Sequence, residues 1–187
     1  KGGFLMKKFI LLLMTITIVS LVSDINCEKT IIPKEAIRFR VIANSNSQED
    51  QNLKVKVKDN LEKDISNVLK NKTTLTSSRT ALENNLLLFE KNINNTLKRE
   101  NSQTTFRINY GMNYFPEKEY KNVIYKEGNY ESLVVTLGDG LGENFWCVLF
   151  PPLCLLEGEE ENAKDVEYHI LVKDILKKYE KNTNKTK

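Results

Sequence analysis

The chain has 187 residues, of which 40% are hydrophobic and 28% charged, and its formal net charge at neutral pH is +3. This length and composition are typical of one globular domain with its own core, and they exclude a wholly disordered chain and a protein with many membrane spans. Three cysteines and one histidine are too few for a zinc finger, a multi-histidine metal enzyme or a disulfide-rich scaffold. We therefore expect no bound metal and no cofactor.

The first segment has the pattern of an export signal. Lys7 and Lys8 precede an apolar run from Phe9 to Val22, and a polar stretch follows it, which is the order of parts in a signal sequence. As a helix this run would span about 21 Å, less than the roughly 30 Å of a membrane core, so cleavage is favoured over a retained anchor. No small-x-small cleavage site stands out, and both alternatives stay open. We interpret residues 1–27 as an upstream extension with a signal peptide or signal anchor.

The positive charge of the chain belongs largely to this first segment. Lys1, Lys7 and Lys8 lie in it, and the remainder of the chain is nearly neutral. The net charge is therefore no argument for nucleic acid as a partner. Contact with a membrane is expected only through an uncleaved signal segment.

A strand and two helices are predicted next. From Ile37 to Ala43 apolar residues alternate with arginines, which predicts a half-buried strand. Ser47 with Asp50 three residues later resembles a capping box, and apolar residues at helical spacing extend the helix that it opens to about Lys70. A Thr/Ser-rich turn then leads to a second amphipathic helix. The apolar stripe of that helix is Leu82, Leu86, Phe89, Ile93 and Leu97.

Three further strands complete the predicted domain. Alternating residues predict a strand over 106–110 that Gly111 closes, and two more strands, 123–125 and 131–137, joined by the turn-forming residues 126–129. This order predicts an α/β fold: a two-layer sandwich with a small mixed or partly antiparallel sheet, an amphipathic helix pair on one face, and a C-terminal helix. The long crossover after the first strand allows the second strand to lie parallel to it.

The chain ends in a segment of segregated charge. Acidic residues predominate over 157–167 and lysines over 173–187, which is typical of a solvated tail. Apolar residues between the two runs allow a C-terminal helix, namely Val166, Ile170, Ile175, Leu176 and Tyr179. We therefore expect a single globular domain over 28–156 and a charged tail with a C-terminal helix over 157–187.

Residues 138–154 have neither the alternating spacing of a half-buried strand nor the apolar stripe of an amphipathic helix. Glycines at alternate positions lead into an apolar run that holds the only tryptophan. The G-x-G-x-G spacing, without an amphipathic helix after it, argues against a dinucleotide site. Pro151 and Pro152 remove two backbone donors, which predicts a rigid ridge or buried loop rather than a helix or central strand. The large side chains of the run could pack in the core or form a docking surface for a partner protein. They are Phe145, Trp146, Leu149 and Phe150.

The two cysteines of this run leave three alternatives open. Cys147 and Cys154 could form a disulfide bond, remain as buried free thiols, or supply a reactive nucleophile. A nucleophile needs a base, and the only histidine, His169, lies on the predicted C-terminal helix. Asp139 and Glu143 could form a carboxylate pair, but acids beside glycines in a loop are typical turn residues. We find no catalytic constellation and expect no enzyme; the alternative is an exported thiol-dependent hydrolase or wall-modifying enzyme that uses Cys147 or Cys154 with His169.

Three stretches of the chain resemble a known family. They are IPKEAIRFRVIANS at 32–45, QEDQ at 48–51 with LK after it, and NFWCVLFPPLC at 144–154. Together they resemble the stage II sporulation protein R family of endospore-forming bacteria, over about residues 32–156. Phe145 is a departure, since the family has a second tryptophan there.

The resemblance implies a signalling protein that is made in the forespore and exported to the space between the forespore and mother-cell membranes. There it would activate a membrane-embedded aspartic protease of the mother cell, which cleaves the precursor of the early mother-cell sigma factor. We expect a non-enzymatic activator that acts by contact, with the side chains of Phe145, Trp146, Leu149 and Phe150 as the hypothetical contact. A wall- or membrane-tethered structural protein is a further alternative, and it requires the apolar run to be retained.

Overall fold

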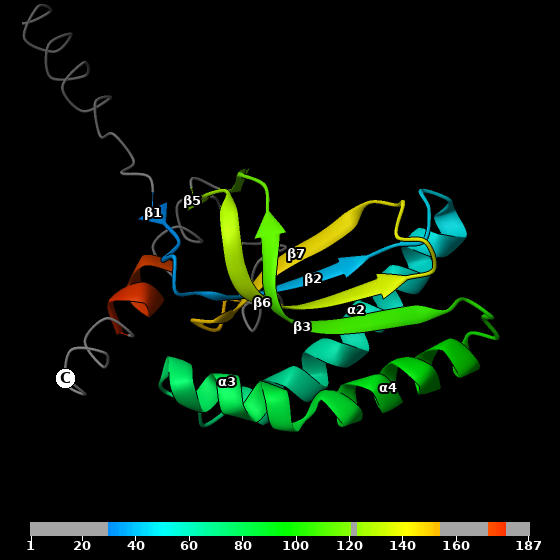
Figure 1. Cartoon of the computed structure of the whole chain (residues 1–187), viewed down its shortest axis with the longest axis horizontal. Helices are drawn as coiled ribbons and strands as arrows, with labels where there is room; N and C mark the ends of the chain where they lie inside the picture. Colours follow the sequence, from blue (N-terminus) through cyan, green and yellow to red (C-terminus); the bar gives the residue numbers. More distant parts are fainter. Residues whose placement is uncertain (1–29, 121–122, 154–171, 179–187) are drawn as a thin grey trace, which may run out of the picture.

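The computed structural model describes residues 30–120, 123–153 and 172–178 (Figure 1). The predicted export segment, Cys154 and His169 lie outside the described residues, as does the acidic run of the tail. Cleavage or anchoring of the export segment therefore stays a prediction.

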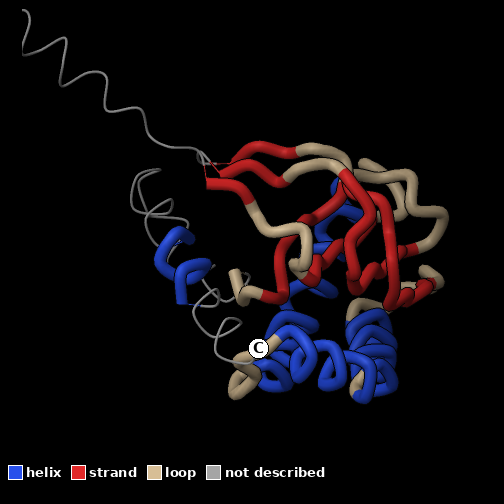
Figure 2. The backbone as a smooth tube through the Cα atoms, turned by 60° about the vertical axis from the view of Figure 1, so that its left-hand side comes forward, coloured by secondary structure: helices blue, strands red, loops and turns tan. Residues whose placement is uncertain are grey.

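A four-stranded mixed sheet and a layer of helices make up the domain (Figures 1 and 2). The strand order is β3-β6-β2-β7, and the strands are β2 (Ile37–Ile42), β3 (Phe106–Phe115), β6 (Gly128–Leu137) and β7 (Asn144–Phe150). The helices are α2 (Gln48–Leu69), α3 (Leu75–Asn84) and α4 (Leu86–Arg99). In Figure 1 α3 and α4 lie below the strands and α2 passes behind them, and one apolar core joins the three helices to the sheet. The predicted two-layer α/β sandwich with a mixed sheet is confirmed.

Local sequence explains β2 and α2. The apolar residues Ile37, Phe39 and Val41 of β2 are fully buried against the helices, and burying each contributes about 1.5–3 kcal/mol. Ser47 caps α2 as predicted, because its hydroxyl accepts the backbone N–H of Asp50 at 3.2 Å. The buried stripe of α2 consists of Leu53, Val57, Leu61, Ile65 and Leu69.

The predicted second helix is two helices, and its start was predicted too late. The Thr/Ser-rich stretch was expected to be a turn, but Thr74 and Ser77 form a capping box and α3 begins at Leu75. Asn85 then leaves the helical region with φ −112° and ψ 11°, and its side chain donates to the carbonyl of Ala81 at 2.8 Å. The break lets both halves of the apolar stripe face the sheet.

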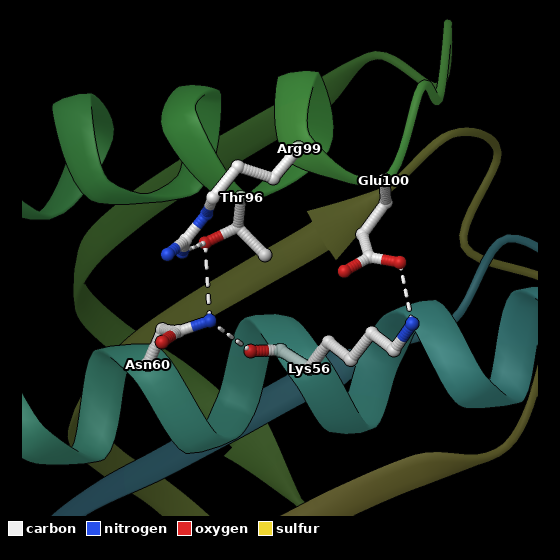
Figure 3. A network of polar contacts seen from close by, with 5 residues as sticks. All are labelled: Lys56, Asn60, Thr96, Arg99 and Glu100. Atoms are coloured by element: carbon white, nitrogen blue, oxygen red, sulfur yellow. Dashed lines mark hydrogen bonds and ion pairs between the residues drawn. The ribbon is translucent and has the colours of Figure 1, made fainter.

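A polar network joins α2 to α4 (Figure 3). Asn60 donates from Nδ2 to Oγ1 of Thr96 at 3.3 Å, and Arg99 donates to the same oxygen at 3.2 Å. One turn away, Lys56 pairs with Glu100. Exposed pairs of this kind contribute at most about 1 kcal/mol, so the apolar stripes provide most of the contact energy between the helices.

The strand pairing differs from the prediction in the length of β3 and in the strand that lies parallel to β2. β3 continues through Gly111 and pairs with β6 over its whole length, Phe106 opposite Leu137 and Phe115 opposite Gly128. The strand parallel to β2 is β6, not β3. β6 takes the inner position because both of its faces are buried at Leu133 and Val134, whereas alternate residues of β3 are exposed.

The short strand before the turn does not form a hairpin with β6. β5 (Val123–Tyr125) instead pairs in parallel with β1 (Thr30–Ile31) and antiparallel with β4 (Lys118–Tyr120), in a separate three-stranded sheet. The turn residues predicted between two strands therefore connect two sheets. Their glycine, Gly128, has a φ of 150° and begins β6 itself.

The segment predicted as a ridge or buried loop is the edge strand β7. It pairs antiparallel with β2 on one side, and Pro151 and Pro152 follow its last residue, Phe150, rather than interrupt it. An edge strand ending at prolines does not need the backbone donors that proline lacks.

A second apolar cluster lies apart from the core between sheet and helices. It brings together β1, β5, the end of β7 and a short C-terminal helix over residues 172–178. Its buried members are Ile32, Ala36, Val123, Val148, Leu153, Val172 and Leu176. The described part of the charged tail thus packs against the domain. Within the described ranges, no helix has both the length and the apolar character needed to cross a membrane.

Candidate partner-binding face

The four residues of the hypothetical contact lie on one strand but not on one face. Leu149 and Phe150 are 2% and 8% exposed and belong to the core between sheet and helices. Phe145 packs against that core, with its ring 6.0 Å from the ring of Phe39 in an edge-on arrangement. Trp146 is half-buried on the opposite face. Of the four, Trp146 is the one that lies away from the helix layer.

The sheet face away from the helices carries the arginines of β2. Because Ile37, Phe39 and Val41 point to the helices, Arg38 and Arg40 point away from them. Phe106, Ile108 and Tyr110 of β3 also pack on the helix side, which leaves Arg107 on the other. We call this surface the arginine face. Its side chains include Arg38, Arg40, Arg107, Val134, Asn144 and Trp146.

Arg40 and Trp146 form the centre of the arginine face. They are register partners across β2 and β7, and the guanidinium carbon of Arg40 lies 4.4 Å from the centre of the indole ring. Arg40 also donates from Nε to Oδ1 of Asn144 at 3.2 Å. Burial lowers the pKa of Arg40, but an arginine side chain keeps its proton in proteins. The stack is a cation–π contact that fixes the direction of the guanidinium.

Arg38 is buried in an aromatic cage. It is 2% exposed, and its guanidinium carbon lies 4.4 Å from the ring centre of Phe115, 4.7 Å from Tyr130 and 5.5 Å from Tyr125. Nε and Nη1 of Arg38 have no hydrogen-bond partner. Burial lowers the pKa of Arg38, and the neighbouring tyrosines partly oppose this. Each cation–π contact stabilises the buried guanidinium of Arg38 by roughly 0.5–2 kcal/mol. The cost of removing this charge from water is larger.

Aromatic and cationic side chains therefore alternate across this face. The ring of Phe115 lies 5.3 Å from that of Trp146 in an edge-on arrangement, and so connects the cage of Arg38 to the stack of Arg40. In the described part of the chain, neither arginine forms an ion pair with a carboxylate. Both positive charges are held by π-systems and not by acids.

A glycine loop closes one end of the face. A side chain at Gly140, where φ is 69°, would come within 2.5 Å of Thr136, and one at Gly142 would come within 2.2 Å of the carbonyl oxygen of Ser45. Glycine is therefore required at both positions. Asn44 accepts the N–H of Asp139 at 3.0 Å, which ties the loop to the segment between β2 and α2.

Further hydrogen bonds stabilise this junction. Ser45 donates to the carboxylate of Asp50 at 2.5 Å, and this bond, followed by the bond from Asn44, lowers the pKa of Asp50. Lys54 donates to the carbonyl of Glu143 at 3.3 Å. Leu141 at the tip of the loop is 80% exposed. The loop thus presents one apolar side chain from a fixed backbone.

For Cys147, the structure selects the disulfide bond over a free thiol or a reactive nucleophile. Cys147 is disulfide-bonded, and the other cysteine of that bond lies outside the described residues. Pairing of Cys147 with Cys154 stays a prediction. Among the residues that the structure covers, no group of three or more His, Cys, Asp or Glu side chains could hold a metal ion.

Sequence reasoning did not find the arginine face. The alternation of β2 placed Arg38 and Arg40 opposite the core, where arginines are ordinarily solvated. Their aromatic partners come from β3, β6 and β7, far along the chain. The sequence does show two arginines close together on the outer face of a half-buried strand. This pattern does not indicate which aromatic side chains contact them.

Comparison with known proteins identifies the family. The family model for stage II sporulation protein R matches residues 33–160, which include the four-stranded sheet and all three helices of the layer. The chain is 33% identical over 187 residues to stage II sporulation protein R of Bacillus subtilis (strain 168), with 92% of this chain and 84% of that protein covered. No solved structure matches the chain. The chain belongs to the stage II sporulation protein R family.

Proposed function

We propose that this chain is an exported sporulation signal that activates a membrane-embedded aspartic protease. The protease then processes the precursor of the early mother-cell sigma factor, which couples gene expression in the forespore to that in the mother cell. The match to the family over residues 33–160 carries this proposal. In this proposal, the signal segment that begins with Lys7 and Lys8 directs export of the chain from the forespore. The chain then acts in the intermembrane space, either released by cleavage or held by an uncleaved anchor.

Activation is proposed to occur by contact rather than by chemistry of this chain. A binding partner shifts an equilibrium between inactive and active protease only by its difference in affinity for the two states, and a tenfold difference corresponds to about 1.4 kcal/mol. One exposed surface that prefers the active state is sufficient. The disulfide-bonded state of Cys147 is consistent with a structural and not a nucleophilic cysteine.

The test is reconstitution in a non-sporulating host. The candidate protease and its precursor substrate are co-expressed with and without this chain, and cleavage of the precursor is measured. We expect cleavage only when the chain is present and the protease retains its catalytic aspartates. A chain without residues 1–27 should fail to activate, because it stays inside the cell. Cleavage that is equal with and without the chain would overturn the proposal.

A histidine variant decides between a contact activator and a thiol enzyme. His169 is the only histidine of the chain, and a cysteine nucleophile needs a base. We expect His169→Ala to support full cleavage of the precursor in the same host. Loss of cleavage by a folded His169→Ala protein would favour the thiol-dependent hydrolase.

A further inference from the structure

We propose that the arginine face docks an acidic segment of a partner protein, whose carboxylates pair with Arg40 and Arg107 while its apolar side chains pack on Trp146. This inference rests on the proposed function in one respect, since it takes the activated protease to be the partner.

The face is positively charged, and no carboxylate in the described part of the chain pairs with its arginines. The one acid in the four strands of the main sheet, Glu131, lies on the helix side, where Arg79 of α3 binds it through two hydrogen bonds of 2.6 and 2.7 Å. Arg38, Arg40 and Arg107 form no ion pair with any acid that the structure describes. Among the residues that the structure describes, an arginine on the helix side is therefore neutralised by a carboxylate and those of the arginine face are not.

The burial of Arg38 strengthens this field. Charges on an open surface are screened over about 8 Å at physiological salt, whereas buried charges are screened much less. Arg38 lies two residues before Arg40 on the same strand, and it is 2% exposed with two nitrogens unpaired. Its charge thus adds to the potential that an anion would meet at Arg40.

The geometry of Arg40 suits a carboxylate. The stack on Trp146 at 4.4 Å and the bond to Asn144 at 3.2 Å hold the guanidinium in one direction. A guanidinium binds a carboxylate through parallel N–H bonds, and holding it in place beforehand reduces the entropy lost on binding. The half-buried indole of Trp146 provides adjoining apolar area, which is typical of interface anchors.

Arg107 lies within reach of the same segment. Arg40 pairs with Val134 of β6, and Val134 pairs with Asn109 of β3, two residues from Arg107. One strand therefore separates the two arginines, and neighbouring strands are about 4.8 Å apart. A short extended segment with two carboxylates can contact both. Arg107 is exposed, so its guanidinium is accessible from solvent.

A protein segment fits this face better than an anionic membrane. Basic surfaces that bind anionic lipid usually gather 4–8 lysines or arginines in one cluster. The arginine face has three arginines, of which Arg38 is buried. Such a face is better suited to a few directed pairs than to a layer of headgroups. An acidic segment is therefore the occupant that we assign.

Direct binding tests the assignment. The full chain, exported and purified, is titrated with the detergent-solubilised candidate protease, and the dissociation constant is measured by microscale thermophoresis at low and physiological salt. Charge reversals at Arg40→Glu and Arg107→Glu are compared with Lys91→Glu, which makes the same change at an exposed position of α4. Circular dichroism and denaturant unfolding establish that each variant is folded.

We expect each face variant to weaken binding about tenfold or more, Lys91→Glu to bind like the wild type, and the wild-type affinity to fall with salt. Arg107→Glu keeps the test decisive if Arg40→Glu does not fold. Wild-type affinity in folded Arg107→Glu would overturn the docking face, as would absence of wild-type binding at low salt. Binding to phosphatidylglycerol vesicles in place of the protease would assign the face to lipid and overturn the inference.

The co-expression assay separates this inference from the proposed function. Binding of the wild-type chain without cleavage of the precursor would overturn activation and leave the docking face standing. Full cleavage with both Arg40→Glu and Arg107→Glu would overturn the docking face and leave activation standing.

Discussion

Arg40 of β2 lies directly across from Trp146 of β7, with its guanidinium carbon 4.4 Å from the centre of the indole ring. The only tryptophan of the chain is therefore neither a core residue on the helix side nor a free surface residue. It is half of a cation–π pair on the face that the helices leave uncovered. Its substitution separates a role in folding from a role in docking.

Trp146→Ala is expected to leave a folded protein that activates poorly. Because the ring is half-buried, its loss should lower the free energy of unfolding by about 2 kcal/mol, less than for a fully buried tryptophan. Urea unfolding and the co-expression cleavage assay are measured on the same variant. If cleavage falls only as far as the fraction of folded protein does, Trp146 has a role in stability alone.

Arg38→Met is expected to change stability by no more than about 1 kcal/mol, in either direction. Methionine fills the space inside the rings and removes an unpaired buried charge, and replacing buried charges by apolar side chains is often neutral or stabilising. Arg38→Ala leaves a cavity and should cost about 3 kcal/mol. The free energy of unfolding in urea compares the two. A methionine variant as unstable as the alanine variant would mean that the cation itself stabilises the cage.

Glu131 is expected to make stability depend on pH in the acid range. The hydrogen bonds from Arg79, and to a lesser extent from Tyr110, lower the pKa of Glu131 in the folded protein. Its contribution is complete above the unfolded pKa of about 4.3 and is lost as the pH falls through the lower folded value. The free energy of unfolding should therefore fall more between about pH 6 and pH 3 in the wild type than in Glu131→Gln. Glu117→Gln, at an exposed acid, should follow the wild type; identical slopes in all three proteins would contradict the assignment.

Gly142→Ala is expected to destabilise the protein by about 3 kcal/mol or more. Its Cβ would come within 2.2 Å of the carbonyl oxygen of Ser45, so backbone must move. The matched control is Gly111→Ala in β3, where the nearest atom is 3.9 Å from the new Cβ, and it should cost less than about 1 kcal/mol. Thermal unfolding distinguishes the two variants. Equal melting temperatures would show that the junction at Ser45 yields easily.

Cys147 is expected to pair with Cys154. Peptide mapping of the exported protein without reductant should yield one cross-linked peptide that holds both cysteines, and reduction should separate it. A disulfide in so short a loop stabilises by a few kcal/mol at most, so Cys154→Ser should lower stability but preserve the fold. A cross-link between Cys147 and Cys27 in the mapped protein would contradict this pairing.

Local sequence patterns were sufficient to predict most of the individual helices and strands. They were not sufficient to predict which strands pair with one another. The alternation from Ile37 and the cap at Ser47 predicted β2 and the start of α2, because both depend on neighbours within a few residues. The split at Asn85 was missed since the apolar stripe has the same spacing on both sides of it. The parallel pairing of β2 with β6 joins residues about a hundred positions apart, such as Arg40 and Val134, and no local spacing encodes it.

The same limit applied to the candidate site. The run containing Trp146 was identified as unusual, yet prolines at its end suggested a ridge or loop where the structure has an edge strand. Alternation along that strand puts Phe145 and Leu149 in the core and Trp146 on the other face. The partner of Trp146, Arg40, lies on a strand that was predicted correctly, but the contact between them depends on the antiparallel register of β2 and β7.

The second apolar cluster brings the first and the last described segments of the chain together. It joins Ile32, near the first described residue, to Val172 and Leu176 of the C-terminal helix, so the chain enters and leaves the domain at the same end. Figure 1 shows β1 and that helix together at one side, with the loop between β6 and β7 at the other. A tag joined directly before Thr30 or directly after Lys178 would therefore lie at one pole of the protein, and Leu141 would be presented from the opposite pole.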